Sequence, residues 1–112
     1  KLGNYDNAIK YLNDFSSSDL LIQARAYSLI GDSYVEINDY ENAIYYFKKA
    51  SNENPNEFFT PNYLLKLALV YEEIGDLGSA LDTYEEIIKE FQNSPEYQTS
   101  LKNKSRIEGL LL

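Results

Sequence analysis

The residues of this chain that could carry out chemistry are carboxylates that occur in pairs. The pairs are Glu72 with Glu73, Glu85 with Glu86, and Glu53 with Glu57. Two carboxylates act as a general acid and a general base only where their surroundings separate their pKa values. These pairs lie in polar, helically periodic stretches, which are typical of solvated helix faces. We therefore expect ordinary surface charge at these positions.

Other reactive groups are missing from the sequence. It contains no Cys and no His, which excludes disulfides, thiol nucleophiles, imidazole catalysis and the usual zinc sites. It has no calcium-binding loop, no glycine-rich phosphate loop and no nucleophile motif. Asn103-Lys104-Ser105 matches a glycosylation sequon, but it falls in a predicted helix, and we interpret it as a chance match. We predict a protein that is not an enzyme and that uses no cofactor and no metal ion.

The overall charge narrows the range of partners. The 112 residues carry a formal net charge of −8. An acidic chain repels phosphate backbones and anionic lipid headgroups, so we predict no nucleic-acid binding and no direct membrane contact. No apolar run approaches the roughly 20 residues that a membrane-spanning helix needs. A hydrophobic content of 44% is enough for one domain with a modest core.

Apolar residues recur at intervals of three and four along the chain, which predicts an all-α fold of about six helices. The first helix is expected over residues 4–14, with Asn4 as its N-cap, and residues 16–19 are expected to cap the next. Thr60 and Ser94 are expected to be N-caps, because each precedes a proline suited to the first helical turn. The remaining helices are expected over residues 20–37, 40–53, 61–74, 77–91 and 95–111.

Two small residues lie at positions where the predicted helices are expected to touch. Gly31 lies inside a predicted helix, where it costs roughly 1 kcal/mol relative to Ala. A glycine in such a place usually allows a neighbouring helix to approach closely. Ala43 is expected to serve the same contact from the following helix, with Tyr34, Tyr40 and Phe47 filling the space around it.

A short motif also recurs along the chain. It reads Gly3-Asn4-Tyr5-x-x-Ala8, then Asn38-Asp39-Tyr40-x-x-Ala43, then Gly75-Asp76-Leu77-x-x-Ala80. The three Ala positions lie 35 and 37 residues apart. A period of this length is typical of helical hairpins that stack on one another.

In this register the chain resembles the tetratricopeptide repeat family, whose pattern is an aromatic residue, Leu-Gly, Tyr, Ala, a second aromatic residue and Pro. The matching positions are Tyr27, Ile30, Gly31, Tyr34, Ala43, Phe47 and Pro55, and then Leu64, Leu67, Ala68, Tyr71, Gly75, Ala80 and Tyr84. The chain departs from the pattern with Tyr27 for Trp, Asn38 for the turn Gly and Ala68 for Gly, each of which keeps the size or the turn tolerance.

The resemblance implies a right-handed superhelix of helical hairpins in one domain. Residues 1–19 would be the second helix of a partial repeat, residues 20–57 and 58–93 two repeats, and residues 94–112 a C-terminal capping helix. Because Lys1 stands inside a motif, we expect the chain to be a fragment of a longer protein.

The resemblance further implies a non-enzymatic scaffold that binds a peptide or protein in a concave groove lined by the first helix of each repeat. By family register the groove residues are Arg25, Ser28, Asp32, Val35, Glu36, Asn62, Leu65, Leu69, Glu72 and Glu73. Apolar residues beside carboxylates favour a partner with apolar and basic residues. Ser28 and Asp32 stand where chaperone-type members place Lys and Asn, which disfavours recognition of acidic chaperone tails.

Two other interpretations stay open. One is a structural spacer or oligomerisation segment whose exposed faces self-associate into a homo-oligomer, and the other is an accessory to a separate catalytic domain. The stretch from Glu90 to Tyr97 is similar to a bacterial subgroup that includes periplasmic and membrane-anchored envelope proteins, although Gln92 replaces the usual Pro. The sequence does not fix the compartment, and this resemblance favours the envelope over the cytoplasm.

Overall fold

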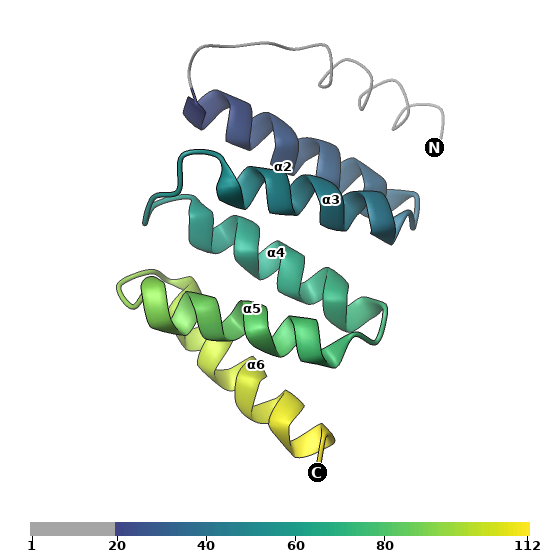
Figure 1. Cartoon of the computed structure of the whole chain (residues 1–112), viewed down its shortest axis with the longest axis vertical. Coiled ribbons are helices and arrows are strands. Elements are labelled where there is room, and N and C mark those ends of the chain that lie inside the picture. Colours follow the sequence, from purple (N-terminus) through teal and green to yellow (C-terminus); the bar gives the residue numbers. More distant parts are fainter. Residues whose placement is uncertain (1–19) are drawn as a thin grey trace. The chain divides into compact units, whose positions relative to one another are not determined.

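The computed structural model describes residues 20–112, and these residues form five α-helices and no strand (Figure 1). The helices are α2 (Leu20–Glu36), α3 (Tyr40–Asn52), α4 (Thr60–Glu73), α5 (Leu77–Glu90) and α6 (Glu96–Leu110). The predicted all-α fold is confirmed, and each boundary in this range falls within one residue of its predicted place. The helix expected over residues 4–14, with its cap, and the cap expected at residues 16–19 lie outside the described residues.

The described helices belong to two compact units. The unit that ends at Pro55 contains the hairpin of α2 and α3, and the unit that begins at Asn56 contains α4, α5 and α6. Both hairpins are the supersecondary element that the sequence period predicts. The stacking of such hairpins into a right-handed superhelix, and the repeat boundaries at residues 57 and 93, stay predictions.

The same turn connects the two helices of each hairpin. Asn38, with φ of 61°, and Gly75, with φ of 80°, both adopt the left-handed conformation that ends a helix. The Asn38 N–H donates to the carbonyl of Val35 at 3.0 Å, and the Gly75 N–H donates to the carbonyl of Glu72 at 3.0 Å. Asn is among the few residue types other than Gly that tolerate this conformation. The prediction that Asn38 replaces a turn glycine is therefore confirmed.

An aspartate follows the turn in both hairpins and caps the next helix. The carboxylate of Asp39 accepts a hydrogen bond from the Asn42 N–H at 3.3 Å, and that of Asp76 accepts one from the Ser79 N–H at 3.1 Å. The pKa of Asp76 is lowered because Ser79 donates hydrogen bonds to the charged carboxylate. In both hairpins, therefore, a residue in the left-handed conformation ends the first helix and an aspartate caps the second.

The predicted N-caps at Thr60 and Ser94 are wrong. Thr60 Oγ1 accepts a hydrogen bond from the Asn56 N–H at 2.8 Å, and the N-cap of α4 is Phe59, which has no side-chain capping bond. The Ser94 hydroxyl donates to the carbonyl of Phe91 at 2.7 Å, and the N-cap of α6 is the proline that follows. Both hydroxyls form hydrogen bonds with backbone groups that precede the helix and do not cap it. Ser and Thr side chains can always bond to nearby backbone groups in this way.

In the first hairpin, Gly31 on α2 lies close to the ring of Phe47 on α3. A Cβ atom added at Gly31 would lie 2.6 Å from Cε1 and 2.7 Å from Cδ1 of Phe47. These distances are well inside van der Waals contact, so an L-residue with a side chain would force the helices apart. Phe47 and Ala43 are both buried. The predicted role of Gly31 as a point of close helix approach is confirmed.

The core of the second unit contains residues from three helices. Ala68 of α4, Ala80 and Tyr84 of α5 and Ile107 of α6 form one fully buried cluster. Ala68 occupies the position that corresponds to Gly31, where a methyl group fits. Because Ile107 is fully buried, α6 is an integral part of this core.

We predict that Gly31→Ala lowers the free energy of unfolding by about 1–3 kcal/mol, the usual cost of overpacking a core contact. Gly109→Ala is the matched control, because nothing lies within 4 Å of a Cβ added at Gly109. The control should be neutral or stabilising by up to about 1 kcal/mol. Urea unfolding followed by circular dichroism measures both. Equal effects of the two substitutions would contradict the tight contact.

We predict that Asp76→Asn removes part of the acid sensitivity of the fold. The folded-state pKa of Asp76 is lowered, so its contribution is complete above the unfolded-state pKa of about 4 and is lost as the pH falls through the folded-state value. Asn caps helices as well as Asp, so both proteins should be equally stable at pH 7. The wild-type protein should then lose more stability on acidification, as measured by urea midpoints. If the stability of the wild-type protein and that of the Asp76→Asn variant fell in parallel with pH, this prediction would be wrong.

Candidate functional site

The predicted groove residues on α4 differ in exposure. Asn62 and Glu73 are exposed, and Leu69 is 47% exposed. Leu65 is half-buried because it packs against the core cluster of its own unit. The face of α4 therefore offers one well-exposed leucine with polar neighbours on the same helix, and Leu65 at its edge.

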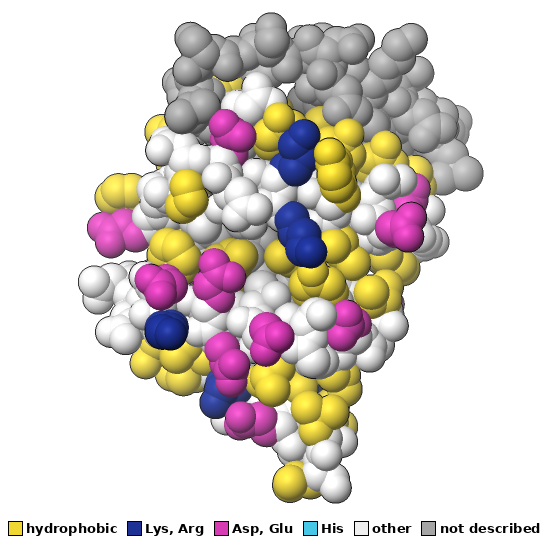
Figure 2. Space-filling view, viewed as in Figure 1, with side chains coloured by type: hydrophobic (Ala, Val, Ile, Leu, Met, Phe, Trp, Pro, Cys, Tyr) yellow, Lys and Arg dark blue, Asp and Glu magenta, His cyan; other side chains and the backbone are white. Residues whose placement is uncertain are grey.

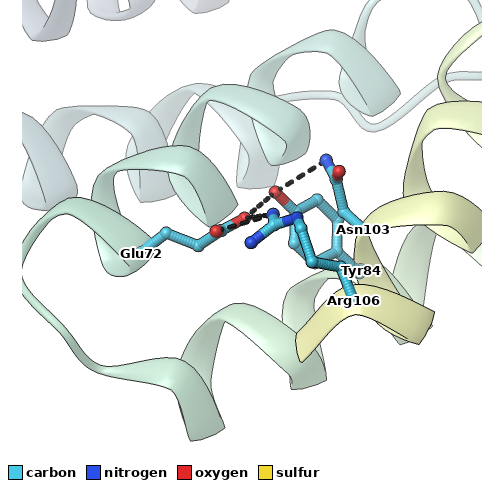
Figure 3. A network of polar contacts seen from close by, with 4 residues as sticks. All are labelled: Glu72, Tyr84, Asn103 and Arg106. Carbon is cyan, nitrogen blue, oxygen red and sulfur yellow. Dashed lines mark hydrogen bonds and ion pairs between the residues drawn. The ribbon is translucent and has the colours of Figure 1, made fainter. Parts of the chain in front are cut away.

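Glu72, the remaining predicted groove residue on α4, takes part in a network that joins all three helices of its unit (Figure 3). Arg106 Nη2 on α6 lies 2.7 Å from Glu72 Oε1 and 2.9 Å from Oε2. The hydroxyl of Tyr84 on α5 donates to Glu72 Oε2 at 2.5 Å, and Asn103 Nδ2 on α6 donates to that hydroxyl at 3.1 Å. Glu72 is thus tied to α5 and α6 and is mostly covered, with 17% of its side chain exposed.

The network follows from the tyrosine at the buried position of α5. A buried aromatic ring adds hydrophobic contact, but a buried hydroxyl needs a partner. Burial first, and then the hydrogen bond to the Glu72 carboxylate and its charge, raise the pKa of Tyr84, so the hydroxyl stays protonated and donates. The repeat pattern predicts Tyr84 in the aromatic position, but it does not predict the bond of Tyr84 with Glu72 or the roles of Asn103 and Arg106. A polar aromatic residue at a core position was the available signal.

The predicted groove residues on α2 are also unequal. Arg25 and Glu36 are exposed, Asp32 and Val35 are half-buried, and Ser28 is only 3% exposed. Ser28 therefore offers almost no surface to a partner. The predicted groove residues on α2 belong to the first unit, and those on α4 belong to the second. The α2 face and the α4 face are therefore treated as two separate candidate surfaces.

A cluster of tyrosines with one lysine lies on the first hairpin, and the sequence analysis missed it. Lys49 Nζ lies 4.7 Å from the ring centre of Tyr27 and 5.3 Å from that of Tyr45, which is cation–π geometry. The rings of Tyr34 and Tyr46 stack with centres 5.6 Å apart, and Tyr45 meets Tyr46 edge-on at 5.1 Å. The signal in the sequence is the spacing of Tyr45 and Lys49, since residues four apart are neighbours on a helix.

The surroundings of Lys49 favour its charged form. Partial burial acts to lower the pKa of Lys49, but its interactions with Tyr27 and Tyr45 outweigh that effect and raise the pKa above its ordinary value. The ammonium group is therefore charged at neutral pH and is held between two rings. Next to it, a shallow surface pocket of about 340 Å³ is lined by Tyr45, Lys48, Lys49, Asn52 and Glu53.

Of the paired carboxylates, Glu73, Glu85 and Glu86 are exposed, as expected of surface charge, whereas Glu72 is mostly covered. The pKa of Glu86 is raised, first by partial burial and then by the negative charge of Glu90 one helical turn away. Within residues 20–112, no three acidic side chains gather closely enough to hold a metal ion. None of the helices described there is long and apolar enough to cross a membrane.

Comparison with known proteins identifies the class of these hairpins. Sequence models of a family described as Tetratricopeptide repeat match residues 34–104 and residues 1–57. The chain belongs to the tetratricopeptide repeat family. Members of this family generally mediate protein–protein interaction and are typically non-enzymatic scaffolds.

The chain is also similar to a protein with a longer sequence, the uncharacterized protein ycf37 of Guillardia theta. The two are 35% identical over 89 residues, which cover 76% of this chain and 48% of that protein. The chain therefore spans about half the length of this curated relative.

We predict that the buried hydroxyl of Tyr84 contributes more to stability than the ion pair between Glu72 and the half-exposed Arg106. Tyr84→Phe should lower the free energy of unfolding by about 1–2 kcal/mol, because Glu72 loses a charge-assisted bond and Asn103 loses its acceptor. Arg106→Gln should cost under about 1 kcal/mol, since the Arg106 side chain is 46% exposed. Urea unfolding of both variants measures the difference. A larger loss for the arginine variant would reverse this ranking.

Proposed function

We propose that this chain binds a peptide or protein partner through the exposed faces of its first helices, α2 and α4, with α4 as the principal contact. The observation that carries the proposal is Leu69, which stands 47% exposed on α4. An exposed leucine on a helix that is otherwise well packed is a suitable anchor for an apolar side chain of a partner.

The charge on this face selects among partners. The negative charge of Glu72 is already offset by Arg106. Glu73 lies exposed one residue further along α4, and it is the carboxylate on this helix that remains for a partner. Together with the net charge of −8, this supports a segment that carries basic residues beside apolar ones.

The network also supports the proposal through rigidity. Glu72 on α4 is bonded to side chains of both α5 and α6. A face held in this way loses little conformational freedom when a partner binds, which reduces the cost of association.

The proposal is tested by fluorescence anisotropy with a labelled peptide in which Lys alternates with Leu. Leu69→Ser should weaken binding about tenfold, because a leucine side chain would no longer be buried. Leu101→Ser on α6, where the leucine is 36% exposed, is the matched control and should bind like the wild-type protein. Equal loss in both variants, or no binding by the wild-type protein, would overturn the proposal.

Sedimentation at several concentrations tests the alternative of a self-associating spacer. The proposed function predicts a monomer that retains the peptide at low salt and releases it at high salt. A concentration-dependent dimer that dissociates on Leu69→Ser would instead assign the face to a second copy of the chain.

We also propose a larger bacterial envelope protein as the setting. The support is the stretch from Glu90 to Tyr97 and its similarity to the envelope subgroup of the family. Fractionation of the cells that make the protein, with antibody detection, tests this. Recovery in the cytoplasmic fraction alone would contradict it.

A further inference from the structure

We propose that one face of α3, towards its C-terminal end, is a second docking surface, which takes an acidic protein segment with an apolar anchor residue. The surface consists of Tyr45, Lys48, Lys49, Asn52 and Glu53, which line the pocket of about 340 Å³. These residues are spaced by three and four along α3, so they lie on one side of the helix.

Charge is the first argument for this occupant. Residues 20–55 contain three basic side chains, and two of them, Lys48 and Lys49, line this pocket. Within residues 20–112, neither lysine forms a salt bridge with a carboxylate. Figure 2 shows Lys or Arg side chains next to hydrophobic ones over the α2–α3 hairpin, where Asp and Glu side chains are also visible, and it shows mostly Asp and Glu among the charged side chains over α4 to α6. In a chain of net charge −8, two adjacent ammonium groups without a carboxylate partner in residues 20–112 attract an acidic ligand locally.

The tyrosines supply the apolar part of the surface. Tyr45 is 53% exposed, and its ring is held edge-on against Tyr46 at 5.1 Å. A ring fixed in this way offers apolar area with little conformational entropy to lose on binding. A leucine or phenylalanine of the ligand would bury the exposed part of this ring.

Lys49 has a fixed position in this surface. Its ammonium group lies over the rings of Tyr27 and Tyr45, 4.7 and 5.3 Å from their centres. A carboxylate that approaches the pocket therefore meets a charge that is already oriented, with the exposed Lys48 beside it. This preference is opposite in sign to that proposed for α4, so the two surfaces would select different segments.

The test is a titration of the whole chain with a fluorescein-labelled peptide in which Glu alternates with Leu and Phe. We expect saturable binding at low salt and about fivefold to tenfold weaker binding after Lys48→Glu with Lys49→Glu, since two exposed ion pairs are lost. The matched control is Lys89→Glu with Lys102→Glu, which makes the same change of net charge at exposed positions on α5 and α6. The control pair should bind like the wild-type protein.

Further variants separate this surface from the α4 face and from non-specific attraction. Tyr45→Ser should weaken binding of this peptide, and Leu69→Ser should leave it unchanged. Three outcomes would overturn the proposal: no binding by the wild-type protein, equal loss in both lysine pairs, or equal binding of a peptide in which Ser replaces Leu and Phe. Sedimentation showing a dimer that only the Lys48 and Lys49 variant dissociates would also overturn it, because the occupant would then be a second copy of the chain.

Discussion

The missing Cβ at Gly31 sets how closely α2 and α3 approach, and the first hairpin depends on it. The ring of Phe47 occupies the space that a side chain at Gly31 would need, with its nearest atom 2.6 Å from that Cβ position. Once the helices are this close, Ala43 and Ala50 of α3 are fully buried. In the second unit a methyl group at Ala68 and a fully buried tyrosine on α5 serve the same packing. In both hairpins the two helices pack closely only if a small residue faces an aromatic ring, Gly31 in the first and Ala68 in the second. This steric requirement explains why small residues recur at a fixed period.

The buried tyrosine of the second unit carries a hydroxyl that needs a hydrogen-bond partner. Tyr84 is fully buried, yet its hydroxyl bonds with both Glu72 and Asn103. The hydroxyl of Tyr84 on α5 therefore links α4 and α6, and these bonds fix the position of α4, which carries the candidate binding face. Glu72, which the family register places in the groove, also ties α4 to α5 and α6 through these bonds.

Much of this architecture follows from local sequence signals. Periodicity located each described helix to within one residue, and Gly31, Asn38 and Gly75 marked the close contact and the turns correctly. These features depend on neighbours in sequence, or on the size of one side chain. The caps at Thr60 and Ser94 were predicted wrongly, because a hydroxyl has several backbone groups within reach and tertiary context decides among them.

The candidate surfaces were less predictable than the fold. Arg106 lies 34 residues from Glu72 in the chain, so only the packing of α6 brings the two charges together. Likewise, Lys49 meets Tyr27 only through the pairing of α2 with α3. The family register named the residues on α2 and α4, but it could not tell that Ser28 is buried or that Glu72 is paired. Exposure and pairing are properties of the folded chain.

We propose that the α4 face binds a basic, apolar segment. The most direct test of this proposal is to follow the backbone amide signals of the whole chain by NMR during titration with a peptide in which Lys alternates with Leu. We predict that the largest shifts cluster at Asn62, Leu65 and Leu69, with small changes along α3. Shifts concentrated on α3, or spread evenly over the chain, would contradict it.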